Sequence, residues 1–103
     1  MKITISGRHM DVTDGIREHA LARFQKLDRL SLKIDHVKLA IWVEGTRHTA
    51  EAVVHVGKGS TLITEVDAPD MYAALDLAAA KLERQLKKHK ERRKDRRVAS
   101  KRG

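Results

Sequence analysis

The chain has 103 residues, enough for one domain with a modest core, and it contains no cysteine, which excludes disulfides and thiolate metal sites. No apolar run approaches the ~20 residues of a membrane span, and the N-terminus lacks the apolar run of a signal peptide, so we expect a soluble, cytoplasmic protein. The net charge of +8 is localised, because residues 81–103 hold 12 of the 22 Lys and Arg residues but only 3 of the 14 Asp and Glu residues. A concentration of positive charge at one end of the chain attracts polyanions. Nucleic acid is therefore the first partner class to consider.

The first part of the chain predicts a short strand and one amphipathic helix. Polar and apolar residues alternate over residues 2–6, and Gly7 follows them. Thr13 is suited to the N-cap of a helix, with Asp14 in the first turn, where the helix dipole favours negative charge. Apolar residues at helical spacing then predict a helix over residues 14–29, with a stripe made of Ile16, Ala20, Phe24 and Leu27.

Three strands joined by short turns are expected next. Apolar and polar residues alternate over residues 36–43 and 48–56, and residues 44–47 form a hairpin connection between them. A second turn over residues 57–60 leads to a last strand over residues 62–66. One face of this sheet should be solvated, and its candidates are Lys38, Trp42, Thr49, Glu51, Val53 and His55.

The last part of the chain predicts a helix that outruns its own core. Asp70 is the expected N-cap. The apolar stripe consists of Met71, Leu75, Ala78, Leu82 and Leu86. No apolar residue follows until Val98, so we divide the chain into a folded domain, residues 1–91, and a basic tail, residues 92–103, which we expect to be disordered. The order β-α-β-β-β-α predicts an α+β two-layer sandwich, a four-stranded sheet with two helices on one face.

Basic side chains gather on one flank of each predicted helix. Lys81, Arg84, Lys88 and Arg92 recur every three or four residues on the second helix, and His19, Arg23 and Lys26 share a face of the first. If the helices lie side by side, the two clusters flank one positively charged groove or ridge. The alternative is that these residues only solvate the helices, but the scarcity of acidic residues favours a polyanion.

The sequence offers few groups for base stacking, metal binding or catalysis. Its only aromatic residues are Phe24, Trp42 and Tyr72, so nucleic acid should be bound mainly through phosphates, sugars and shape. Tyr72 either packs its ring or contacts RNA, and Trp42 is either sheltered by neighbours or used for recognition. The six histidines show no metal-ligand spacing, and we expect no metal and no cofactor. A nuclease site of Lys38, Glu51 and His55 is supported only by their shared face.

Four segments resemble the bacterial hibernation-promoting factor family, which includes the ribosome-associated inhibitor. They are residues 5–13 (ISGRHMDVT), 47–51 (RHTAE), 70–76 (DMYAALD) and 81–90 (KLERQLKKHK). The resemblance implies a double-stranded-RNA-binding-domain-like fold with an added first strand. It also implies a non-enzymatic protein that binds the small ribosomal subunit through ribosomal RNA and inhibits translation by occluding the messenger and transfer RNA channel. The predicted RNA-binding residues are Arg8, His19, Arg23, Lys26, Lys81, Arg84, Gln85, Lys87, Lys88, Lys90 and Arg92.

Among the forms of this family, the chain is most similar to the short one. The long form adds a second, dimerising domain, and the inhibitor form carries an acidic tail, whereas the tail here is basic. The short form implies a monomer in solution that acts with the ribosome modulation factor to favour paired, inactive ribosomes. The competing interpretations are a general double-stranded-RNA or DNA binding module and, with less support, a small nuclease.

Overall fold

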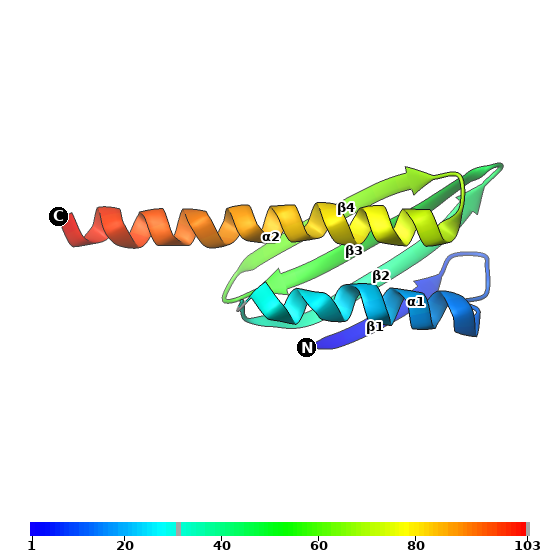
Figure 1. The fold of residues 1–103 in the computed structure, drawn as a ribbon, viewed down its shortest axis with the longest axis horizontal. Helices are drawn as coiled ribbons and strands as arrows, with labels where there is room; N and C mark the ends of the chain where they lie inside the picture. The colour runs from blue at the N-terminus through cyan, green and yellow to red at the C-terminus, as the bar shows by residue number, and fades with distance from the viewer. Residues whose placement is uncertain (31, 103) are drawn as a thin grey trace.

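Four strands form one sheet, and two helices cover one of its faces (Figure 1). The computed structural model describes the backbone of residues 1–30 and 32–102 and the side chains of residues 1–30 and 32–92. The elements are β1 (Lys2–Gly7), α1 (Asp14–Gln25), the 3₁₀ helix η1 (Lys26–Leu30), β2 (Ile34–Glu44), β3 (Arg47–Val56), β4 (Ser60–Ala68) and α2 (Met71–Arg102). The strands lie in the order β1-β2-β3-β4, with β1 parallel to β2 and the other pairs antiparallel. The predicted α+β sandwich is confirmed.

Both predicted helix caps are present. The Thr13 hydroxyl accepts a hydrogen bond from the Ile16 amide at 3.2 Å, and the Asp70 carboxylate accepts one from the Ala73 amide at 2.9 Å. The helix predicted over residues 14–29 divides at Lys26 into α1 and η1. A 3₁₀ helix repeats every three residues, so Leu27 and Leu30 both face the core.

The core lies between the helices and the inner face of the sheet. Phe24, Ile41, Leu75, Leu82 and Leu86 are among its fully buried side chains. In Figure 1, α1 lies beside α2, and α2 runs across β3 and β4. The whole predicted stripe of α2 is buried, which fixes the rotation of this helix about its axis as far as Leu86. Among the described helices, none is long and apolar enough to cross a membrane.

Beyond Leu86 the helix continues past the end of the sheet (Figure 1). We expected a disordered tail over residues 92–103, whereas the described backbone is helical as far as Arg102; Gly103 lies outside the described residues. Residues 70–102 contain no Gly or Pro, and residues 92–102 are rich in Lys and Arg, which have high helix propensity. The division into a folded domain and a basic tail stays a prediction.

On the outer face of the sheet, one expectation was wrong. Thr49 was predicted to be solvated, but only 3% of its surface is exposed. Its hydroxyl donates to the Asp67 carboxylate at 2.6 Å, and in the strand register it lies opposite Trp42. The large indole on one side and the hydrogen-bonded carboxylate on the other cover this small side chain.

Candidate nucleic-acid interface

The first basic cluster is held by a carboxylate from the other helix. His19 Nε2 lies 2.7 Å from Asp76 Oδ1, and Arg23 Nε lies 2.9 Å from the same oxygen. Asp76 therefore orients both α1 side chains toward α2 and offsets part of the positive charge of Arg23. These two predicted RNA-binding residues are ordered before any ligand arrives, but their combined field is weaker than the sequence suggests.

Tyr72 completes the contact between the helices. Its ring packs edge-on against the His19 ring, with centroids 5.1 Å apart. A Cβ atom added at Gly15 would lie 2.8 Å from the Tyr72 hydroxyl, so a side chain there would displace the Tyr72 ring from its present position. Of the two alternatives for Tyr72, the structure has the packed ring, although 45% of the residue remains exposed.

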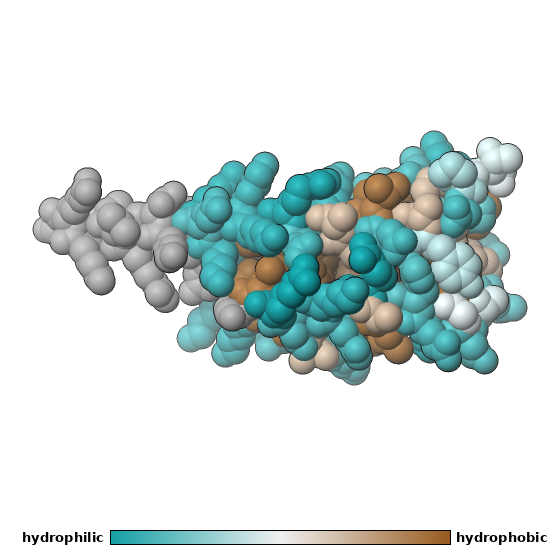
Figure 2. All heavy atoms as spheres, in the orientation of Figure 1, coloured by the Kyte–Doolittle hydropathy of each residue, from teal (hydrophilic) through white to brown (hydrophobic). Residues whose placement is uncertain are grey.

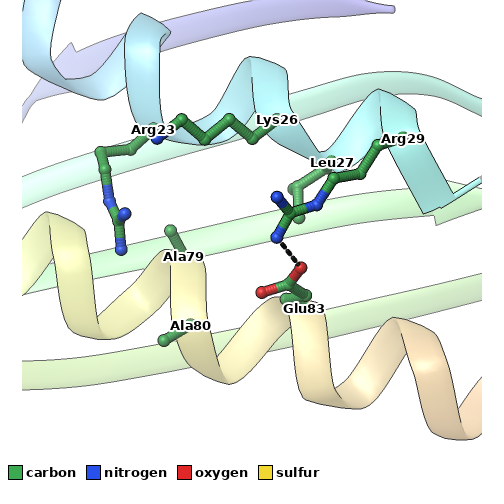
Figure 3. A pocket seen from close by; sticks show the side chains of 7 residues that line it. All are labelled: Arg23, Lys26, Leu27, Arg29, Ala79, Ala80 and Glu83. Carbon is green, nitrogen blue, oxygen red and sulfur yellow. Dashed lines mark hydrogen bonds and ion pairs between the residues drawn. The ribbon is translucent and has the colours of Figure 1, made fainter.

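A small hollow separates η1 from α2 (Figure 3). It is lined by Arg23, Lys26, Leu27, Arg29, Ala79, Ala80 and Glu83. Its volume of about 60 Å³ is far below the roughly 300–1,000 Å³ of small-molecule sites. Arg29, which was not among the predicted site residues, donates to Glu83 at 2.5 Å. The three-residue spacing from Lys26 to Arg29 is the signal that could have identified it, because a 3₁₀ helix places both on one side.

Glu83 is the acidic centre of this region. A hydrogen bond from Arg29, together with the positive charges of Arg29, Lys87 and Arg23, lowers the pKa of the Glu83 carboxyl below its ordinary value. Lys87 Nζ lies 3.9 Å from Glu83 Oε1. The carboxylate therefore stays ionised at neutral pH and offsets part of the positive charge between the helices.

The basic stripe of α2 lies mostly away from α1. Gln85, half-buried, accepts a hydrogen bond from the Thr64 hydroxyl of β4, so this side of α2 faces the β4 edge. Lys81, Lys88 and Arg92 share that side by helical spacing and are exposed. The prediction of a single groove flanked by both basic clusters is therefore wrong for Lys81, Lys88 and Arg92. The Gln85 side chain is engaged in a contact within the fold.

The remaining α2 residues of the predicted site have other positions. Arg84 and Lys87 are exposed, and helical spacing places them on the outer side of α2. Lys90 donates to the Leu30 carbonyl at 2.9 Å and satisfies the C-terminal end of η1. Figure 2 shows the helix-covered face as largely hydrophilic, with small hydrophobic patches between polar side chains. The candidate interface is this outer surface of the helices rather than a cleft.

Arg8 lies apart from the other predicted residues, beyond the end of β1 and near the outer face of the sheet. Its guanidinium carbon is 4.3 Å from the centroid of the Trp42 ring, and its Nη2 is 3.3 Å from Glu51 Oε1. Trp42 is therefore sheltered by a neighbour, which is one of the two alternatives that the sequence left open.

Two of the three hypothetical nuclease residues, Glu51 and His55, are engaged in other contacts. Glu51 pairs with Arg8, and His55 Nδ1 forms a 3.0 Å hydrogen bond with the Thr61 hydroxyl. Within residues 1–30 and 32–92, no three His, Asp or Glu side chains come together as a metal site would require.

Comparisons with known proteins place this arrangement in a family. A protein named ribosome hibernation promoting factor from Azotobacter vinelandii is 40% identical over 92 residues, which cover 89% of this chain and 85% of that protein. The protein of the same name from Escherichia coli K12 is 37% identical, with 89% and 96% covered.

Two solved structures have the same fold. A ribosomal subunit interface protein from Coxiella burnetii aligns with a TM-score of 0.80 and 26% identity over 88% of this chain and 99% of that one. The N-terminal domain of Thermus thermophilus Protein Y aligns with a TM-score of 0.78 and 31% identity, over 86% and 99%. Residues 3–94 match the family described as Sigma 54 modulation protein / S30EA ribosomal protein. The chain therefore belongs to this family, the one that its sequence motifs predict, and its relatives include ribosome hibernation promoting factors.

Proposed function

We propose that the chain is a ribosome hibernation factor that binds the small ribosomal subunit through ribosomal RNA. The observation that carries the proposal is the exposed basic surface on a helix docked to the core, in a chain whose relatives are named ribosome hibernation promoting factors. Lys81 and Arg84 present their charges from a backbone that packs on the sheet, so less conformational entropy is lost when they meet phosphates.

The mechanism that we propose is occlusion, without enzymatic chemistry. The folded body occupies the channel where messenger and transfer RNA lie, and its basic helix surface neutralises ribosomal RNA phosphates. Arg23 and Lys26 extend that surface to the other side of the interhelical hollow. Translation stops because the ligands are excluded, and no bond is made or broken. The protein acts in the cytoplasm, where ribosomes translate.

We also propose that the bound chain favours paired, inactive ribosomes together with the ribosome modulation factor. Residues 92–102 contain seven Lys or Arg residues and one Asp. A segment of this charge is attracted along the RNA backbone rather than repelled from it. It would therefore leave the path of the modulation factor free. Gradient sedimentation of ribosomes with the factor, with and without this chain, should show a larger paired peak when the chain is present.

Specific binding to the small ribosomal subunit is tested by co-sedimentation of the chain with purified small subunits. Duplex RNA, duplex DNA and transfer RNA are added as competitors in excess over the subunits. We expect the chain to stay with the subunits and the ribosomal RNA to remain intact. If every competitor removed the chain from the subunits equally well, the chain would be a general double-stranded-RNA or DNA binding module. Cleavage of the ribosomal RNA would identify a nuclease.

A further inference from the structure

A second hollow lies at one end of the sheet, away from the basic surface of α2. It is lined by Arg8, His9, Trp42, Val43 and Glu44 and has a volume of about 220 Å³. Trp42 is the only tryptophan of the chain. Two residues that line this hollow, Arg8 and His9, come from the segment between β1 and α1 rather than from the helices.

The Arg8 guanidinium is held in place before any ligand binds. One face lies over the Trp42 ring, 4.3 Å from its centroid, and one edge is tied to Glu51 of β3 at 3.3 Å. In the strand register, Glu51 lies opposite Ala40 of β2. The Arg8 side chain is nevertheless 54% exposed. A planar cation is therefore supported on one face and open to solvent on the other.

The backbone of the connecting segment is specialised to place these groups. A Cβ atom at Gly7 would collide with the Met10 carbonyl oxygen, so only glycine allows the chain to fold back here. His9 has a φ of 57°, in the left-handed region that non-glycine residues rarely adopt. The Arg8 amide donates to the Ile41 carbonyl at 2.8 Å and fixes the segment beside Trp42. Strained conformations of this kind persist where the surrounding structure maintains them.

We propose that this hollow binds one unpaired nucleobase of single-stranded RNA, stacked on the outer face of the Arg8 guanidinium. Proteins use arginine planes as well as aromatic rings to stack splayed-out bases, and Arg8 and His9 also attract the adjoining phosphate. Trp42 supports the arginine from below, so the stack consists of base, guanidinium and indole. The inference deepens the proposed RNA binding by adding a base contact to the phosphate contacts of the helices. It rests on the proposed function only for the identity of the RNA that supplies the base.

The fluorescence of Trp42 reports on this site directly. The protein is titrated with a short single-stranded oligoadenylate and with an abasic ribose-phosphate oligomer of the same length, with excitation at the red edge of indole absorption. We expect saturable quenching by oligoadenylate and none by the abasic oligomer. The indole N–H resonance of Trp42 in an NMR spectrum provides a second readout and should shift only with the base-bearing oligomer. Equal responses to both oligomers would overturn the proposal.

Two variants separate stacking from charge. Arg8→Lys keeps the cation but removes the plane, and it should bind oligoadenylate about tenfold more weakly. Lys38→Ala removes a cation from the same sheet face outside the hollow and should bind within about twofold of the unsubstituted protein. Circular dichroism checks that Arg8→Lys is folded. Undiminished oligoadenylate binding by folded Arg8→Lys would refute the stacking role.

The same protein samples distinguish this inference from the proposed function. If the chain co-sediments with small subunits but oligoadenylate leaves Trp42 unchanged, the base site is wrong and the proposed function stands. If oligoadenylate quenches Trp42 but the chain does not bind subunits, the base site stands and the proposed function is wrong.

Discussion

The two halves of α2 are one continuous helix, but they are stabilised in different ways. As far as Leu86, the helix packs a buried apolar stripe against the sheet. Beyond Leu86 it runs past the sheet, and the next apolar residue is Val98. Tertiary packing fixes the first half. In the second half, the described side chains (residues 87–92) include Lys90, which donates to the Leu30 carbonyl, and helix propensity supplies further stability. Helical backbone alone therefore does not indicate a rigid binding surface.

For a polyanion ligand, this difference matters more than the number of charges. A cation on the docked half is held by a backbone that packs on the sheet, whereas the projecting half lacks this packing, so we expect fixing it on a ligand to cost more conformational entropy. The projecting half has more charge but should contribute less binding free energy per residue. Each prediction below tests this contrast, beginning with the largest expected effect.

The largest effect should come from the buried stripe. Leu82→Ala removes a side chain with no exposed surface and should lower the free energy of unfolding by about 2–5 kcal/mol. Lys88→Ala, a solvent-exposed change on the same helix, should stay within about 0.5 kcal/mol. Urea unfolding followed by circular dichroism measures both. Equal effects would show that the docked half is not held by its apolar stripe.

The next prediction compares binding by the two halves. The Lys81→Ala, Arg84→Ala double variant, which removes two exposed cations from the docked half, should bind small subunits more weakly than a chain lacking residues 93–103. It should also reduce the slope of log affinity against log salt by roughly 1.4–1.8, because each lost phosphate contact removes roughly 0.7–0.9. A Lys2→Ala, Lys38→Ala pair on β1 and β2 removes the same charge outside the helices and serves as the control. If the truncation lowered the affinity for small subunits more than the double variant did, the projecting half would contribute more to binding than the docked half.

A smaller effect is expected at the contact between the helices. Asp76→Asn removes the carboxylate shared by His19 and Arg23, and because Asp76 is 45% exposed, the loss of stability should be at most about 1 kcal/mol. RNA affinity should increase, since two oriented basic side chains lose their internal counterion. Thermal unfolding and duplex RNA binding at low salt are the measurements. Weaker RNA binding by a folded variant would show that Asp76 mainly positions these side chains.

The smallest effect concerns the acid response of Glu83. Its pKa is lowered in the folded protein, so the ionised form stabilises the fold above the unfolded pKa of a glutamate, about 4.3. That stabilisation is lost as the pH falls through the lower folded value. Glu83→Gln should therefore be less stable than the unsubstituted protein at neutral pH, with the difference narrowing in acid. A difference in stability independent of pH would exclude this linkage.

Local signals in the sequence predicted most of the fold. The caps at Thr13 and Asp70 and the apolar stripe of α2 depend on neighbouring residues, and all are present in the structure. The change to a 3₁₀ helix at Lys26 was missed because helical spacing alone does not distinguish i+3 from i+4 packing over a single turn. The burial of Thr49 was missed because it depends on side chains from the strands on either side.

The candidate site was less predictable than the fold because it depends on how the helices are placed together. The sequence shows which residues share one helix face, but not which flank meets the neighbouring helix. Asp76 and Glu83 of α2 contact α1 and η1, whereas Lys81 and Lys88 lie on the opposite flank. Arg8 is separated from Trp42 and Glu51 along the chain, so their contact depends on strand pairing.

The parallel pairing of β1 with β2 has a consequence for synthesis of the chain. β2, β3 and β4 are joined by short turns, so β3 and β4 each pair with the strand made immediately before them. β1 is made first but has no partner until β2 follows, with α1 and η1 between them. Local pairings form faster than distant ones, because closing a long loop costs more entropy. During synthesis, β1 therefore waits unpaired until β2 has been made, and the Arg8 to Trp42 contact forms only after β1 joins the sheet.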